Sequence, residues 1–114
     1  MEPARFKTQG AQGDVFFRRV KSIPKTATAK EFSGPIIIAH SETGHHHSFA
    51  KHEGVTYYET RDPMVAYLRL ESASLLEHHR SFDTHGAVHF EAGCYELRRP
   101  REYVSRDEAR MVVD

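Results

Sequence analysis

The segment IIIAHSETGHHHSF, residues 36–49, decides the fold class of this chain. It opens with three isoleucines, a β-branched run that is too short for a helix and typical of a buried strand. Ser41 to Gly44 are typical of a four-residue hairpin loop, because glycine adopts positive φ without strain. The residues after Gly44 are therefore predicted to return as a second strand beside the first.

Other short runs of β-branched and aromatic residues follow the same pattern along the chain. They recur roughly every 8–12 residues with Gly, Pro or Asp at the breaks, which indicates a small all-β sandwich or barrel. Residues 14–24 and 55–60 are the clearest runs. Residues 64–72 fit a helix or a strand and are assigned to a strand because strands flank them, residues 87–100 alternate less cleanly, and residues 72–85 are ambiguous. Ser105 and Glu108 have the spacing of a capping box and predict a short C-terminal helix.

The length and composition predict one domain. A chain of 114 residues suffices for a single modest core. Residues 1–13 are polar and show no periodicity, so we expect an N-terminal arm followed by a single β-rich domain over 14–114. Sixteen basic and sixteen acidic residues balance, which argues against a general binder of nucleic acid or of a membrane surface.

The chain shows the features of a protein from a reducing compartment. Cys94 is the single cysteine, so no disulfide can form within the chain. The N-terminal residues lack the apolar stretch of a secretory signal, and no apolar run approaches the roughly 20 residues of a membrane span. We therefore expect a cytoplasmic protein without a membrane partner.

Histidines form the candidate site. The chain has nine, and five of them fall in residues 36–54. With the loop at 41–44, His40 and His45 face each other at its base, and strand alternation places His47 on the side of His45. A second histidine-rich stretch, residues 78–89, could meet the first from a neighbouring strand. The predicted ligands are His40, His45, His47, His79, His85 and His89.

Imidazole clusters of this kind predict a divalent metal ion, because neutral histidine is a common ligand of zinc, copper, iron and nickel. Zinc is our first expectation, with iron, nickel or manganese as alternatives. The leading hypothesis is a small metal-binding β-domain. The sequence identifies no substrate and leaves the question of catalysis open.

Three alternatives remain beside the metal site. In the first, the hairpin is an exposed polar loop without a function. In the second, the histidines tune contacts in a homo-oligomeric assembly protein, such as a phage structural protein. The third is an RNA or phosphate binder that uses the arginine-rich segment 95–110. Acidic residues nearly balance the arginines of this segment, which favours a solvated, ion-paired edge over a nucleic-acid site.

Three motifs of the chain resemble one group of proteins. The chain is similar to short, uncharacterised bacterial and phage-borne proteins that have the same histidine hairpin and an arginine-rich C-terminal segment. The motifs that carry this resemblance are AHSETGHHH at 39–47, GDVFFRRV at 13–20 and RRPREYV at 98–104. The resemblance covers most of the chain. It implies a phage or prophage setting and no particular reaction or site residue.

Overall fold

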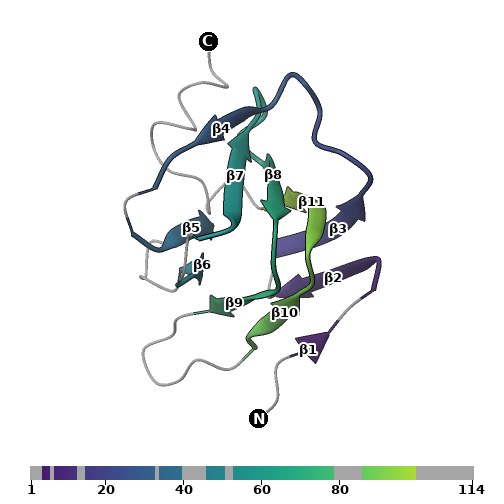
Figure 1. The fold of residues 1–114 in the computed structure, drawn as a ribbon, viewed down its shortest axis with the longest axis vertical. Helices are drawn as coiled ribbons and strands as arrows, with labels where there is room; N and C mark the ends of the chain where they lie inside the picture. Colours follow the sequence, from purple (N-terminus) through teal and green to yellow (C-terminus); the bar gives the residue numbers. More distant parts are fainter. Residues whose placement is uncertain are drawn as a thin grey trace.

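The computed structural model shows an all-β protein (Figure 1). It describes residues 4–5, 7–12, 15–32, 34–39, 46–50, 53–78 and 86–99. The strands form two sheets, and all pairings are antiparallel except that of β1 with β10. No helix occurs among the described residues, so the predicted all-β class is confirmed for them.

Each sheet combines strands that are far apart in the sequence. The first has five strands, in spatial order β1 (Ala4–Arg5), β10 (Val88–Phe90), β9 (Ser74–His78), β6 (His47–Phe49) and β5 (Ile36–Ala39). The second has six strands, in spatial order β2 (Gln9–Gln12), β3 (Val15–Val20), β11 (Gly93–Arg98), β8 (Val65–Leu70), β7 (Val55–Glu59) and β4 (Thr28–Lys30).

One hydrophobic core lies between the two sheets. Alternate residues of the strands enter it, as the period of two in a half-buried strand requires. Phe90 of the five-stranded sheet contacts Phe17 and Tyr95 of the six-stranded sheet, with ring centroids 4.7 and 4.8 Å apart. Phe49 reaches the same ring at 5.4 Å. These edge and tilted contacts join the layers at their centre.

The hairpin predicted from residues 36–49 forms between β5 and β6. Ile36 pairs with Phe49 and Ile37 with Ser48, which is the register that a loop at 41–44 requires. The register then shifts, and Ala39 pairs with His47. The loop residues themselves lie outside the described part of the chain, so the predicted opposition of His40 and His45 stays a prediction.

The N-terminal segment differs from the arm that its polar composition predicts. Residues 9–12 form β2, which pairs with β3, and residues 4–5 form β1, which pairs with β10. The buried side chain of Gln12 anchors this segment to the other sheet, as described below. The sequence pattern misses both strands because neither contains a β-branched or aromatic residue.

The C-terminal helix predicted from Ser105 and Glu108 falls on residues outside the described part. Within the described ranges, we find no helix of the length and apolar character needed to cross a membrane.

Candidate functional site

Two of the predicted ligands, His47 and His89, lie within the described residues, and the structure places His47 in the protein interior. It lies at the start of β6 and is fully buried. It shares the inner face of its strand with Phe49, which packs against Phe90 in the core. Its Nδ1 atom is 2.7 Å from Oε1 of Gln12, which belongs to the opposite sheet. The histidine thus bridges the two layers through a side-chain contact.

Gln12 fixes which nitrogen of this imidazole carries the proton. Its Nε2 donates hydrogen bonds to the carbonyl oxygens of Leu76, at 2.9 Å, and Gly86, at 2.5 Å. Both partners are acceptors, so the amide nitrogen must face them and Oε1 must face His47. The Nδ1–H of His47 therefore donates to Oε1 of Gln12. In the neutral ring, Nε2 then carries the lone pair.

The strands beside β6 bring the two histidine-rich stretches together. β6 pairs with β9 as well as with β5, and His47 is in register with His78 on one side and Ala39 on the other. The first residue of the second stretch, His78, thus lies on a strand next to that of His47, which is the arrangement that shared ligands would need. His40 follows Ala39 in the sequence and His79 follows His78.

His89 lies on the opposite face of the same sheet. Its neighbours in β10, Val88 and Phe90, are buried in the core, whereas His89 is half-buried on the outer side. There Arg5 Nη1 lies 3.4 Å from its Nδ1. The structure therefore does not bring His89 and His47 together, because the sheet separates them.

The remaining predicted ligands, His40, His45, His79 and His85, lie outside the described residues. Among the residues that are described, no group of three or more His, Cys, Asp or Glu side chains is arranged to hold a metal ion. The prediction of a metal site through these histidines therefore stays a prediction.

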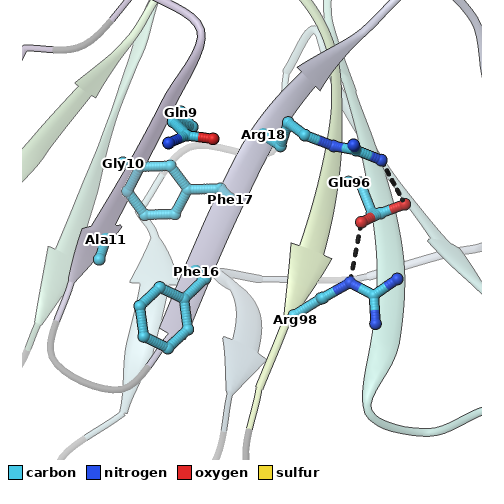
Figure 2. A pocket seen from close by; sticks show the side chains of 8 residues that line it. All are labelled: Gln9, Gly10, Ala11, Phe16, Phe17, Arg18, Glu96 and Arg98. Carbon is cyan, nitrogen blue, oxygen red and sulfur yellow. Dashed lines mark hydrogen bonds and ion pairs between the residues drawn. The ribbon is translucent and has the colours of Figure 1, made fainter.

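A second polar cluster occupies the outer face of the six-stranded sheet (Figure 2). Glu96 of β11 accepts a hydrogen bond from Arg98 Nε at 2.9 Å, and its other oxygen accepts from Arg18 Nη2 at 3.3 Å. Tyr67 of β8 donates to the same oxygen at 3.3 Å. This part of the arginine-rich segment is an ion-paired edge, as its balanced charge predicts.

The cluster shifts the titration of its members. Partial burial acts to raise the pKa of Glu96, but the hydrogen bond and charge of Arg98, with the charge of Arg18, outweigh it and lower the pKa below its ordinary 4.5. Burial and the facing Glu96 carboxylate raise the pKa of Tyr67. The Glu96 carboxylate is therefore ionised, and Tyr67 is a neutral donor, at neutral pH.

A cavity of about 520 Å³ adjoins this cluster. It runs from β2 across β3 to β11, and Phe16, Arg18, Glu96 and Arg98 are among its lining residues. Phe16 is 58% exposed, which is unusual for a large apolar side chain on a sheet face. Figure 2 shows its ring beside Ala11 of β2, while the charged groups gather on the β11 side.

Sequence reasoning missed two interior polar residues. Gln12 was assigned to a polar arm, and Arg99 to a solvated edge. Strand alternation gave the signal for Arg99, since it continues the buried phase of Tyr95 and Leu97. Gln12 had no comparable signal, because an isolated polar residue beside glycines has the composition of a loop.

Comparisons with known proteins add the family. Residues 11–100 match the model of the family described as Domain of unknown function (DUF8820). No curated protein and no solved structure matches the chain. The matched range spans β3 to β11 and includes both polar clusters.

Proposed function

Because the chain belongs to the DUF8820 family, whose description names no activity, we propose a function from its own geometry: it binds a divalent metal ion, with zinc first, through His47. One observation carries the proposal. The hydrogen bond from His47 Nδ1 to Gln12 leaves Nε2 as the nitrogen with the lone pair.

Metal-binding histidines are oriented in the same way. The ring nitrogen that does not bind the metal usually donates its hydrogen to an oxygen acceptor, which fixes the tautomer and the ring orientation. Gln12 supplies that acceptor, and its two carbonyl partners hold it in place.

The position of β6 supplies candidates for the other ligands. It lies between β5 and β9, and both neighbouring strands lead directly into the histidines predicted from the sequence. His40 and His45 border the β5–β6 loop, and His79 follows β9. His89 is excluded from this set because it lies on the other face of the sheet.

The burial of His47 also favours one kind of site. A structural zinc ion is enclosed by four protein ligands, whereas a catalytic zinc keeps a position open to water and substrate. His47 is fully buried between the sheets. The proposed ion is therefore structural, and it would tie the β5–β6 hairpin to β9.

The test begins with untagged protein purified without a nickel column. We expect close to one equivalent of metal by elemental analysis, or uptake of one equivalent of added zinc. In a nitrogen–proton NMR correlation of the imidazole rings, His47 should show the Nδ1–H tautomer, and its Nε2 resonance should move when zinc is added.

Variants then locate the site. His45→Ala and His79→Ala should lower zinc affinity by tenfold or more each, and His89→Ala serves as the matched control that keeps wild-type affinity. Replacing the buried His47 itself could prevent folding. The NMR measurement uses the unmodified protein, so it tests zinc binding at His47 without a variant. Folded protein without metal, without zinc uptake and with an unmoved Nε2 resonance would overturn the proposal, and the oligomeric state would become the next measurement.

A further inference from the structure

We propose that the cavity on the outer face of the six-stranded sheet binds a nucleotide unit, with its base against Phe16 and its phosphate on Arg18 and Arg98. The site is independent of the metal site, because it lies on the solvent side of the other sheet. It has an apolar end and a charged end, which Figure 2 shows on either side of the β3 strand.

The apolar end presents an aromatic ring to solvent. Phe16 alternates with the buried residues Val15 and Phe17 and is 58% exposed. Ala11 of the edge strand β2 is in register with it, and this small residue leaves the ring accessible from the β2 side. Exposed aromatic rings on a sheet are platforms on which planar bases stack.

The charged end holds two guanidinium groups in place. The side chains of Arg18 and Arg98 are 60% and 64% exposed, while that of Glu96 between them is 11% exposed. Arg98 uses Nε toward Glu96, so its two terminal nitrogens point away from the carboxylate (Figure 2). Arginine offers five N–H donors, and the Glu96 contacts use few of them. The remaining donors suit a phosphate.

The local charge favours an anionic ligand although the whole chain is neutral. The pairings place three cross-strand rows on this face, centred on β11 residues Cys94, Glu96 and Arg98. The described residues of these rows include three arginines and one carboxylate, that of Glu96. The arginines are Arg18, Arg69 and Arg98. The face therefore carries an excess of positive charge.

The size of the cavity selects among anions. A volume of about 520 Å³ lies within the range of small-molecule sites. Inorganic phosphate would use the arginines and leave Phe16 uncovered, whereas a nucleotide fills both ends. The nucleotide is either free or part of a single strand, since both offer one base and one phosphate.

The experiment uses the full chain and four probes: AMP, ribose 5-phosphate, adenosine and a short oligoadenylate. Binding is followed by backbone amide NMR shifts. We expect AMP to shift the amides of β3 and β11 around Phe16 and Arg98. Ribose 5-phosphate and adenosine should each bind about tenfold more weakly, because each lacks one of the two contacts. An affinity for the oligoadenylate well above that for AMP identifies a single strand as the source, and equal affinities identify the free nucleotide.

Two variants and two controls test the residues. Phe16→Ala and Arg98→Gln should each lower AMP affinity about tenfold. Leu75→Ala and Arg61→Gln make the same kinds of change at exposed positions outside the cavity. Both should leave the affinity for AMP unaltered. Thermal unfolding verifies that all four fold. The proposal is overturned if neither AMP nor the oligoadenylate binds, if Arg61→Gln weakens binding as much as Arg98→Gln does, or if an acidic peptide binds in their place.

Discussion

Gln12 and His47 form a buried polar contact between the two sheets. Gln12 is 3% exposed and satisfies two backbone carbonyl groups as well as the imidazole. A buried polar group is tolerated where its hydrogen bonds are made, and it is costly where they are lost. The pair therefore stabilises the fold even without a metal ion.

Replacing Gln12 by leucine tests this role. The variant keeps a similar volume but leaves the Nδ1–H of His47 and the carbonyl groups of Leu76 and Gly86 without their side-chain partner. We expect the free energy of unfolding to fall by about 2–3 kcal/mol, measured by urea denaturation. Gln9→Leu, at an exposed position of the same strand, is the matched control and should change stability by less than about 0.5 kcal/mol. Equal effects of the two substitutions would contradict the role of Gln12.

The sequence singled out His47 as a metal ligand, which stays a prediction, and gave no sign of its contact with Gln12. Histidine clustering and strand alternation pointed to His47, because both are local properties. Gln12 is 35 residues away and belongs to the other sheet. Only the packing of the two sheets brings the amide to the imidazole, and no local pattern encodes that contact.

At the scale of the strands, one row of side chains crosses the outer face of the six-stranded sheet. Arg18, Glu96 and Tyr67 are in register on β3, β11 and β8. Cross-strand pairs of opposite charge add modest stability to a sheet. Because Glu96 is largely shielded from solvent, its ion pairs are screened less than those of fully exposed groups.

This row predicts a pH dependence of stability. The pKa of Glu96 is lowered in the folded protein, so its contribution is fully present above its ordinary 4.5 and is lost as pH falls through the folded value. Glu96→Gln should therefore be less stable than wild type at pH 7, by about 0.5–1 kcal/mol. The difference should shrink as pH falls below about 4.5, in urea denaturation at a series of pH values.

Arg98→Gln supplies the second measurement on the same row. It removes the cation that hydrogen-bonds Glu96, so the pKa of Glu96 should move back toward its ordinary value. As pH falls, the stabilisation that ionised Glu96 provides should then begin to be lost at a higher pH than in wild type. Stability curves for wild type and Glu96→Gln that run parallel between pH 3 and pH 7 would contradict the assignment.

Strand prediction succeeded where side chains carry the signal. β3, β5 and β7 are rich in β-branched and aromatic residues, and all three were expected. The pattern of β8 fits a helix as well, and it was assigned to a strand because strands flank it. The ambiguous stretch at 72–85 contains β9. β4, with the sequence TAK, is exposed throughout and was assigned to a connection, because an edge strand with no buried side chain has no hydrophobic period.

For the whole molecule, the order of strands was beyond sequence reasoning. β11 lies between β3 and β8, which are separated from it by long stretches of chain. Such pairings are chosen by the fit of complete hydrophobic faces and not by neighbouring residues. The sequence therefore predicted an all-β sandwich or barrel and a hairpin, whereas the assignment of each strand to its sheet and the order of the strands came from the structure.

Arg99 supplies a second polar contact between the two sheets, besides that of Gln12 with His47. It follows β11 and is 4% exposed. Its Nε donates to the carbonyl oxygen of Pro63 at 2.9 Å, in the turn before β8. Its Nη1 donates to the carbonyl oxygen of Ile38, in β5 of the other sheet, at 2.5 Å. Its guanidinium also lies 5.8 Å from the ring centroid of Tyr57.

The adjacent arginines make a matched pair of substitutions. Arg99→Lys keeps the charge, but one ammonium group cannot reproduce donors directed at both Pro63 and Ile38, so a buried charge loses part of its compensation. We expect a loss of about 2–4 kcal/mol in the free energy of unfolding, measured by urea denaturation. Arg98→Lys makes the same change at a side chain that is 64% exposed and should cost less than about 0.5 kcal/mol. If the two variants lose equal stability, the hydrogen bonds of Arg99 to Pro63 and Ile38 do not add measurably to the stability of the fold.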